Sequence, residues 1–259
     1  MTTPSRVVIT GASDGLGAAL ARHYAARGAT LGLIARREDH LRALADSLGV
    51  PTAVYPLDVR DGAAIAAAAA DFIGRFGVPD VVIANAGISA GTVTGAPGDA
   101  EVFERIVRTN VIALFDTFAP FVPGMRAAGA GCLVGIASVA GVRGLPGAGA
   151  YSASKAAAIS YLESLRVELR GSGVGVVTIA PGYIRTPMTA TNRYRMPFLT
   201  DVDVFARKAV AAIEARRSFA VIPWQMGVVA RGLRLLPNGV FDALFARAPR
   251  KARDPQGSA

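Results

Sequence analysis

The stretch that decides the fold begins with Arg6-Val-Val-Ile-Thr10, continues as Gly11-Ala-Ser-Asp-Gly15-Leu-Gly17, and runs on as a helical pattern to Arg27. A short apolar run that leads directly into closely spaced glycines and a helix is typical of a buried strand, a tight turn and a crossover helix. Glycines let a backbone approach a ligand closely, and the following helix offers unpaired N–H groups and the positive end of its dipole to an anion. The stretch therefore predicts a phosphate-binding turn, although a tight turn that binds nothing would have the same outline.

Further apolar runs alternate with helical patterns along the rest of the chain. Several are apolar throughout, which suits strands that are buried on both faces of a parallel sheet. The sequence predicts strands at Arg6–Thr10, Thr30–Ala35, Thr52–Leu57, Asp80–Ala84, Cys132–Ala137, Val174–Ala180 and Phe219–Ile222. We expect a single α/β domain over residues 1–259, with one doubly wound, Rossmann-type parallel sheet, helices on both faces and a C-terminal helical extension.

The composition excludes several classes of protein. Of the 259 residues, 52% are hydrophobic and 18% are charged, which is enough apolar material for a sizeable core and excludes disorder as the main state. The single cysteine, Cys132, cannot form an intrachain disulfide, and one thiol with two histidines argues against a zinc cluster, so we predict no metal. No signal-like run opens the sequence, so we expect a cytoplasmic location.

The net charge of +9 is concentrated towards the end of the chain. From Arg193 onward there are twelve basic and five acidic residues, against sixteen and fourteen before it. The basic residues are scattered, and only Lys155, Lys208 and Lys251 are lysines. A nucleic-acid-binding chain more often has lysine-rich runs or basic residues interleaved with aromatics, so we predict no nucleic-acid partner.

The end of the second predicted strand bears on the choice of dinucleotide. An NAD-preferring site usually has an acidic residue here that binds the adenosine ribose, but the sequence has Ala35, Arg36 and Arg37. A guanidinium binds a 2′-phosphate through charge-assisted hydrogen bonds and gains little from an unmodified ribose. The pattern favours NADPH over NADH; alternatively, the two arginines only begin a solvated helix, whose first turn Glu38 and Asp39 would suit.

Three residues in the second half of the chain suit proton transfer. Ser138 follows an apolar strand, and Tyr151 opens a predicted helix that carries Lys155 four residues later on the same face. A phenol titrates at about 10, so an adjacent ammonium that favours the phenolate would bring it towards the working range of an acid–base catalyst. Singly, each residue has an ordinary explanation in packing or capping; together with the glycine turn, they indicate an active site.

These motifs resemble the short-chain dehydrogenase/reductase family, in order and over almost the whole chain. Thr10 to Gly17 is similar to the family's T-G-x-x-x-G-x-G turn, Asp58-Val59 to its adenine-contacting pair, and Asn85-Ala86-Gly87 to its N-A-G motif. The remaining matches are Asn110, Ser138, Tyr151 and Lys155, which correspond to the catalytic tetrad, and Pro181-Gly182 with Thr186, which correspond to the segment that closes over the nicotinamide.

The resemblance implies a role for each of these residues. Ser138 would hydrogen-bond the substrate carbonyl, and Tyr151 would donate a proton to the developing alkoxide. Lys155 would bind the nicotinamide ribose and lower the pKa of the tyrosine, while Asn110 would anchor a water. The implied cofactor is NADP(H), and the residues expected to bind it are Gly11, Ser13, Gly15, Leu16, Gly17, Arg36, Arg37, Asp58, Val59, Asn85, Ala86, Gly87, Tyr151, Lys155, Pro181, Gly182, Ile184 and Thr186.

Two positions depart from the family pattern. Asp14, directly before Gly15, is not basic, so recognition of a 2′-phosphate would depend on Arg36 and Arg37 alone. Ala84 stands where the family often has another asparagine before the N-A-G motif, which is a minor difference. The resemblance also implies a small-molecule carbonyl or alcohol substrate and a homo-dimer or homo-tetramer.

Residues 183–216 are the predicted substrate lid. This segment contains aromatic, methionine and proline residues that suit an apolar substrate, together with Arg185, Arg193 and Arg195. These arginines either meet an anionic substrate group or are ordinary surface charges.

Residues 224–253 form a basic, amphipathic extension. One apolar stripe contains Met226, Val229, Ala230, Leu233 and Leu236, and a second contains Val240, Phe241, Leu244, Phe245 and Ala248. Both stripes must be buried, either on the core or a subunit interface, or on an anionic membrane surface that the flanking basic residues would attract. The extension loosely resembles the lipid- and steroid-handling branch of the family, and we expect it to contribute to an apolar substrate mouth.

We therefore expect an NADPH-dependent carbonyl reductase that acts on an apolar or long-chain ketone. The competing enzymatic hypothesis is an NAD-linked alcohol dehydrogenase, which Arg36 argues against. The competing hypothesis from another class is a non-catalytic dinucleotide-binding protein that regulates a partner, although such a protein has no chemical need of the tetrad.

Overall fold

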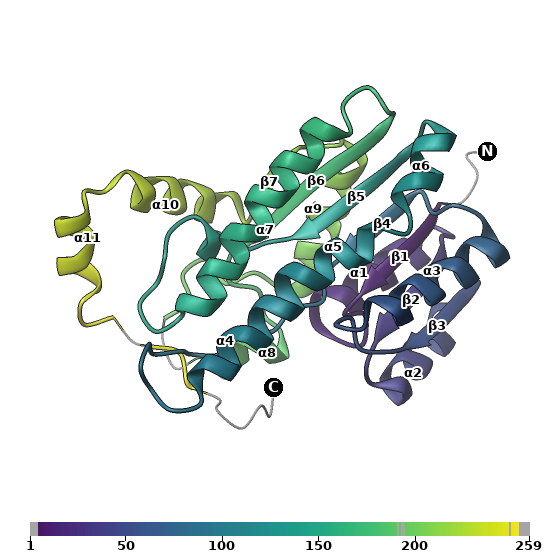
Figure 1. Ribbon diagram of the computed structural model, residues 1–259. Helices are drawn as coiled ribbons and strands as arrows, with labels where there is room; N and C mark the ends of the chain where they lie inside the picture. The colour runs from purple at the N-terminus through teal and green to yellow at the C-terminus, as the bar shows by residue number, and fades with distance from the viewer. Residues whose placement is uncertain (1–4, 191, 193–194, 249, 254–259) are drawn as a thin grey trace.

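A computed structural model describes residues 5–190, 192, 195–248 and 250–253. All strands of the sheet are parallel, in the order β3-β2-β1-β4-β5-β6-β7 (Figure 1). The strands are β1 Arg6–Thr10, β2 Thr30–Ala35, β3 Thr52–Pro56, β4 Val81–Ala84, β5 Gly131–Ile136, β6 Val174–Pro181 and β7 Phe219–Ile222. The predicted strands and the doubly wound parallel sheet are confirmed, with bounds that differ by at most one residue.

Helices cover both faces of the sheet. They are α1 Gly15–Ala25, α2 Glu38–Leu48, α3 Gly62–Phe76, α4 Asp99–Val107, α5 Ala113–Phe118, α6 Val122–Ala128, α7 Gly149–Glu168, α8 Pro187–Ala190, α9 Val202–Glu214, α10 Trp224–Leu235 and α11 Asn238–Phe245. A π-helical turn, η1 Arg108–Ile112, joins α4 to α5, and a 3-10 turn, η2 Val139–Gly141, follows β5.

Each face of the sheet has its own apolar core. On one face the strands pack against α1, α2 and α9, through side chains that include Leu20, Leu41 and Phe205. On the other face they pack against α3, α5, α6 and α7, through side chains that include Phe72 and Leu162. Burial of each such side chain is worth roughly 1.5–3 kcal/mol, so these two cores hold the layers together.

The strand order places the ends of β1 and β4 side by side at the centre of the sheet. The direction in which successive strands are added to the sheet changes at this point. Strands β2 and β3 lie on one side of β1, and β4 to β7 lie on the other. Loops at the carboxyl ends of parallel strands meet at such a switch point and form a crevice there. The glycine turn after β1 and the loops after β4, β5 and β6 are thereby brought together.

The helical stretch Asp99–Ala128 is long and apolar enough to cross a membrane by length and composition alone. In the fold, however, its first part lies along α7 and its middle part along α3 (Figure 1). Val102 and Ile106 of α4 are buried together with Ala150 of α7. The stretch is thus part of the helical layer on one face of the α/β domain.

The predicted lid over residues 183–216 is shorter in the structure. Ile184, the stretch Thr186 to Thr189, and Asn192 border the crevice, but α9 does not. One face of α9, including Phe205, Ala209 and Val210, is buried in the core beside α1. The periodic apolar face of this helix requires burial, which is why it belongs to the scaffold and not to the lid.

The C-terminal extension forms α10 and α11, which project from the domain, and the chain then turns back towards α4 (Figure 1). Met226, Ala230 and Phe241 from the predicted stripes are buried within the chain itself. Arg143 fixes this arrangement, because its guanidinium donates hydrogen bonds to the carbonyls of Leu233 and Leu236 that end α10.

Candidate active site

A single cleft of about 1280 Å³ runs along the carboxyl ends of the strands, from the glycine turn to the start of α7. It is lined by every predicted site residue except two, Gly17 and Asn110. Gly17 packs behind the glycine turn, where a Cβ atom would lie 2.2 Å from the carbonyl oxygen of Gly11. Asn110 is 2% exposed and lies behind the cleft wall, where its side chain contacts Ser154 of α7.

Hydrogen bonds from the N-A-G motif fix the conformation of the glycine turn. Gly11 has φ +65°, which favours glycine, and a Cβ there would meet the backbone of Ala86 at 2.8 Å. The Asn85 side-chain amide donates to the carbonyl oxygens of Thr10 and Gly11, at 2.9 and 3.1 Å. The Thr10 hydroxyl in turn accepts from the backbone N–H of Asn85 and Ala86, both at 3.1 Å. The turn and the loop after β4 are therefore one rigid unit.

The start of α1 is arranged to receive an anion. Its N-cap residue, Asp14, makes no side-chain capping hydrogen bond, and the first turn of the helix contains no acidic residue. The Asp14 carboxylate instead pairs with Arg37, which neutralises its charge beside the turn. The free first-turn N–H groups and the helix dipole fit a pyrophosphate, so the residues present fit a dinucleotide cofactor.

The far end of the cleft is built from three arginines and two carboxylates. Arg37 donates to the Ser13 hydroxyl at 2.8 Å in addition to pairing with Asp14. Asp58 accepts from the Arg60 side chain at 2.6 Å, and this hydrogen bond is the main reason that the pKa of Asp58 is lowered. Arg36, by contrast, donates no hydrogen bond to any described residue, and it borders the cleft.

Ser138, Tyr151 and Lys155 lie together at one end of the cleft, called the catalytic end for the roles that the sequence resemblance implies. Ser138 caps η2, where its hydroxyl accepts from the backbone N–H of Ala140 at 3.1 Å. The Lys155 ammonium, on the same helix as Tyr151, lies 5.9 Å from the centre of the tyrosine ring and donates to the Ile136 carbonyl at 2.8 Å. The β5 carboxyl end thus positions both the hydroxyl and the ammonium beside the phenol.

The titration of this group differs from the expectation in one respect. Desolvation in the cleft raises the pKa of Tyr151, against a smaller lowering by its hydrogen bond with Ser138. Burial lowers the pKa of Lys155 to about 8. The expected lowering of the tyrosine pKa by Lys155 is therefore not what this arrangement produces, because desolvation of the phenol dominates and only the Ser138 hydrogen bond opposes it. The phenol is protonated at neutral pH, which suits a proton donor.

Asn110 supports the catalytic end from behind. It lies on the π-helical turn η1, which breaks the regular helix at this point. Its side chain accepts from the N–H of Ile88 at 2.9 Å, and donates to the Ile88 carbonyl at 3.0 Å and to the Ser154 hydroxyl at 2.9 Å. A Cβ atom on Gly87 would lie 3.2 Å from Asn110 Oδ1 and 3.4 Å from Lys155 Nζ. Asn110 therefore ties the N-A-G loop to α7.

The segment after β6 forms the remaining wall. Ile184 is buried, and Thr186 lies opposite the glycine turn, where a Cβ on Gly15 would be 3.6 Å from its side chain. Thr189 ties this short segment together, because its hydroxyl donates to the Ile184 carbonyl at 2.6 Å. Of the arginines predicted here, Arg185 pairs with Asp201 and Arg195 is exposed, whereas Arg193 lies outside the described residues.

Sequence reasoning expected the C-terminal extension at an apolar substrate mouth, and it missed the polar and basic wall that the structure places there. Ser89, Arg105, Arg250 and Lys251 all border the cleft. The sequence predicts the basic residues after α11 as a cationic flank, although the stretch that contains them is expected at the substrate mouth. Nothing in the local pattern indicates that the chain reverses after α11 and returns to the cleft.

Comparisons with known proteins agree with the geometry. The family model described as short chain dehydrogenase matches residues 5–196. The chain is 40% identical over 246 residues to an uncharacterized oxidoreductase of Myxococcus xanthus, a match that covers 93% of this chain and 96% of the relative. A solved short-chain dehydrogenase from Streptomyces avermitilis superposes with a TM-score of 0.81 at 25% identity, over 94% of this chain and 95% of that one.

Two similar structures were solved with a dinucleotide. A short-chain dehydrogenase/reductase from Burkholderia phymatum in complex with NAD has a TM-score of 0.80 at 26% identity and covers 96% of this chain and 98% of that one. An alcohol dehydrogenase from Thermococcus sibiricus complexed with 5-hydroxy-NADP has a TM-score of 0.75 at 26% identity and covers 84% of this chain and 95% of that one. The structural neighbours therefore include both classes of nicotinamide dinucleotide.

Proposed function

Because this chain belongs to the short-chain dehydrogenase/reductase family, we propose that it is an NADPH-dependent carbonyl reductase that acts on a ketone with an apolar body. The observation that carries the proposal is the grouping of Ser138, Tyr151 and Lys155 at one end of a cleft whose other end suits a dinucleotide. As an oxidoreductase, it would act on an alcohol or ketone group, and reduction is the direction that a protonated Tyr151 favours.

A reduced nicotinamide supplies the hydride when it is bound. The chain's own residues then manage the proton. The Ser138 hydroxyl hydrogen-bonds the carbonyl oxygen and orients the ketone, and the Tyr151 O–H bond breaks as its proton passes to that oxygen. Lys155, with a pKa of about 8, gains and loses protons near neutral pH and so helps to restore the proton on the phenol. Asn110 holds the loop after β4 in place through both backbone groups of Ile88.

The preference for NADPH rests on Arg36. It follows Ala35 at the carboxyl end of β2, a position without an acidic residue. The two carboxylates at this end of the cleft, Asp14 and Asp58, are paired with Arg37 and Arg60. Arg36 has no hydrogen-bond partner among the described residues, and its charge helps to lower the pKa of Asp58. Arg37 already donates to Ser13 and Asp14. We assign the 2′-phosphate contact mainly to Arg36, with Arg37 cancelling the charge of Asp14.

An apolar substrate body is supported by the walls around the catalytic end. Ile88, Ala90 and Met188 border the cleft there. A ketone whose chain covers these side chains would gain roughly 25 cal/mol for each Å² of apolar surface that it removes from water.

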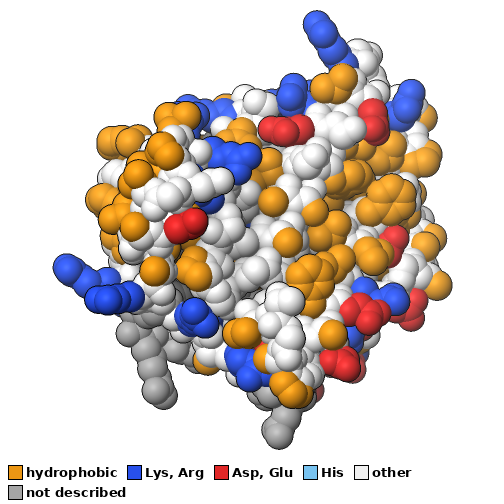
Figure 2. All heavy atoms as spheres, turned by 60° about the vertical axis from the view of Figure 1, so that its left-hand side comes forward, with side chains coloured by type: hydrophobic (Ala, Val, Ile, Leu, Met, Phe, Trp, Pro, Cys, Tyr) orange, Lys and Arg blue, Asp and Glu red, His pale blue; other side chains and the backbone are white. Residues whose placement is uncertain are grey.

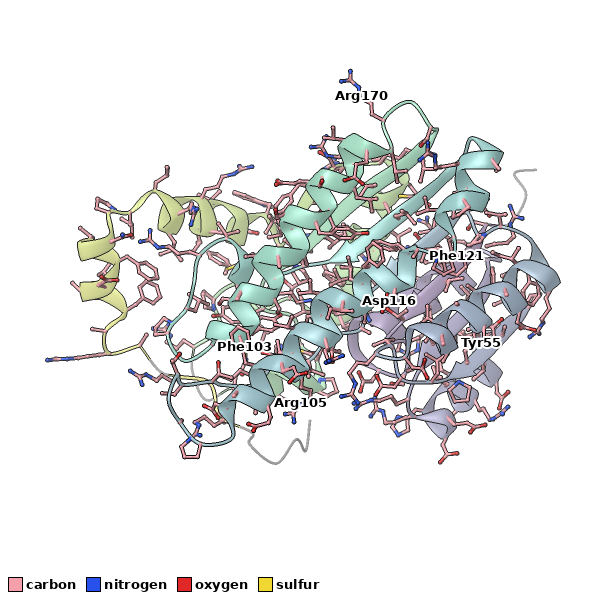
Figure 3. All side chains as sticks on the ribbon, in the orientation of Figure 1. Tyr55, Phe103, Arg105, Asp116, Phe121 and Arg170 are labelled. Atoms are coloured by element: carbon pink, nitrogen blue, oxygen red, sulfur yellow. The ribbon has the colours of Figure 1, made fainter. Side chains whose placement is uncertain are left out.

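We propose that the protein forms a homo-oligomer through α4, η1 and α5. Phe103, Ile112 and Phe115 are large hydrophobic side chains that are exposed on these elements. Figure 3 places Phe103 and Arg105 on different sides of α4, and Arg105 is the one that borders the cleft. An interface here would cover the apolar side of the helix and leave the cleft open. Phe115→Glu should raise the monomer fraction in analytical ultracentrifugation.

A second exposed apolar surface supports peripheral contact with an anionic membrane. On α10 and α11, Trp224, Val228, Leu235 and Leu244 are exposed. Basic side chains lie on α10, at Arg231 and Arg234, and directly after α11, at Arg247. Figure 2 shows hydrophobic patches with Lys and Arg side chains around them on the face that includes this side of the molecule. Such binding should weaken as salt rises, so sedimentation with anionic liposomes at low and high salt tests it. We propose a cytoplasmic location on the membrane's inner side.

The enzymatic proposal is tested with a panel of ketones of increasing chain length, each assayed with NADPH and with NADH. We expect turnover that increases with chain length and a higher kcat/KM for NADPH. A higher kcat/KM for NADH would favour an NAD-linked alcohol dehydrogenase. Tight NADPH binding without turnover of any ketone would favour a regulatory dinucleotide-binding protein.

A further inference from the structure

Four residues after α11 form a strap across the catalytic end of the cleft. The strap is the segment Arg250–Arg253, and each of its four residues lines the cleft. The backbone N–H of Gly91 donates to the Ala252 carbonyl at 2.8 Å, and Gly91 and Arg253 form a parallel bridge. A Cβ atom on Gly91 would lie 2.2 Å from the Lys251 carbonyl oxygen, so the close approach of the strap requires glycine here.

An ion pair fastens the end of the strap. Asp99, at the start of α4, is 5% exposed, and the Arg253 guanidinium donates to both of its carboxylate oxygens at 2.9 Å. Asp99 also accepts from the backbone N–H of Val93 at 2.7 Å, which ties the loop after β4 to the same carboxylate. A paired, planar contact of this kind fixes orientation as well as position. The strap is thus a built wall of the cleft.

The strap carries an ammonium to the catalytic tyrosine. Lys251 Nζ lies 5.9 Å from the centre of the Tyr151 ring and donates to the Ser89 hydroxyl at 2.7 Å. No carboxylate among the described residues forms an ion pair with it, and burial lowers its pKa. A partly desolvated cation whose described polar partner is a neutral hydroxyl is stabilised when an anion joins it.

The charges around the cleft are divided by position. Among the described residues, the acidic ones that line it are Asp14 and Asp58, which lie at the adenosine end and are paired with Arg37 and Arg60. The lining residues contributed by α4 and the strap at the catalytic end include the cations Arg105, Arg250 and Lys251 and no acidic residue. A cleft lined by one sign of charge attracts ligands of the other sign.

We propose that Lys251 is a specificity-determining residue that binds a carboxylate on the substrate, so that this enzyme reduces an oxo acid whose ketone reaches Tyr151. The inference rests on the proposed reductase function and deepens it: the apolar body covers the cleft walls, and the carboxylate lies against the strap. Ser89 and Gly91 are positioning residues, since one orients the ammonium and the other admits the strap.

The first test measures binding without turnover. Pentanoate and pentanamide, which match in shape and differ in charge, are titrated by calorimetry into the enzyme with NADP+ present. Charged hydrogen bonds are worth enough that pentanoate should bind about 10-fold to 100-fold more tightly. Lys251→Met should abolish this difference, and Lys251→Arg should retain it. Arg247→Met removes a charge from the same extension at an exposed position outside the cleft, so it should behave as the wild type.

The second test measures turnover of levulinate and methyl levulinate. The wild type should favour the acid by about 10-fold or more in KM with similar kcat, and Lys251→Met should lose that preference while still reducing the ester. Gly91→Ala should act like Lys251→Met, because it displaces the strap. Equal affinity for pentanoate and pentanamide in the wild type, or a preference that survives in Lys251→Met, would overturn the inference. Absence of turnover with either ketone would instead count against the reductase function, and the calorimetric comparison would still decide the role of Lys251.

Discussion

Lys155 and Tyr151 lie one helical turn apart on α7, with the ammonium 5.9 Å from the centre of the phenol ring. The ammonium is fixed by its hydrogen bond to the Ile136 carbonyl, so β5 determines where the two groups meet. Both groups are desolvated, which keeps the phenol protonated and brings the pKa of the lysine to about 8. This pair is the part of the structure on which the proposed chemistry depends.

Removal of the phenolic hydroxyl tests the proton donor. Tyr151→Phe should lower kcat by roughly 100-fold to 10,000-fold, the range attributed to general acid catalysis, while NADPH affinity changes little. Tyr161→Phe, the same change farther along α7, should leave kcat unchanged because that ring contacts Phe115 and does not border the cleft. Steady-state kinetics and fluorescence titration measure the two quantities. A Tyr151→Phe enzyme with a tenth of the wild-type kcat would refute the assigned role.

The pKa of Lys155 predicts how the reduction responds to pH. Its ammonium loses its proton as the pH rises through about 8, so kcat/KM for the ketone should fall above that value. The fall does not reflect unfolding. Since the pKa of the lysine is about 10.4 in an unfolded chain, the unfolded state binds more protons between the two values, and this group's contribution to stability increases with pH there. A kcat/KM profile that stays flat up to the unfolded-chain value would contradict the assignment.

Arg36 and Arg37 should differ in their effect on the cofactor. Arg36→Ala should weaken NADPH binding by about 10-fold to 150-fold and NADH binding very little, because the 2′-phosphate is the group it contacts. Arg37→Ala should have a smaller and less selective effect, since that guanidinium is already bound to Ser13 and Asp14. Dissociation constants for both dinucleotides decide the matter. Equal losses for NADPH and NADH in Arg36→Ala would make the residue structural.

Arg143 should control the order of the C-terminal helices. Its guanidinium donates to the end of α10 and to Asn238 at 3.0 Å, and it lies 4.0 Å from the centre of the Phe241 ring. Arg143→Met removes the donors and the cation–π contact, each worth roughly 0.5–2 kcal/mol. Hydrogen exchange should then accelerate in residues 233–245 and remain unchanged in β1 to β6. Equal protection of the extension in both proteins would show that its own packing suffices.

Much of the fold could be predicted because its signals are local. A parallel strand that is buried on both faces, such as Val174–Pro181, is apolar throughout, and the glycine turn after Thr10 indicates how the first crossover begins. The positions of Ser138 and Tyr151 follow from the strand and helix that carry them.

The parts that could not be predicted depend on contacts between distant segments. The pairing of Arg37 with Asp14 requires the loop after β2 to approach the glycine turn, and no local pattern states that distance. The strap is a stronger case, because Arg253 reaches Asp99 over more than half of the sequence. The sequence places the C-terminal stretch at the substrate mouth, but the reversal of the chain that brings these particular basic residues to the cleft has no local signal.

The most direct test of the central claim follows the hydride itself. The enzyme is incubated with NADPH that carries deuterium at the transferable position of the nicotinamide, together with a ketone that it turns over, and the alcohol is analysed by mass spectrometry. We predict one deuterium on the carbinol carbon of the product from the wild type, and little product from Tyr151→Phe at the same cofactor occupancy. Deuterium that remains on the cofactor, in an enzyme shown to bind both NADPH and the ketone, would contradict the assignment of this cleft as a carbonyl reductase site.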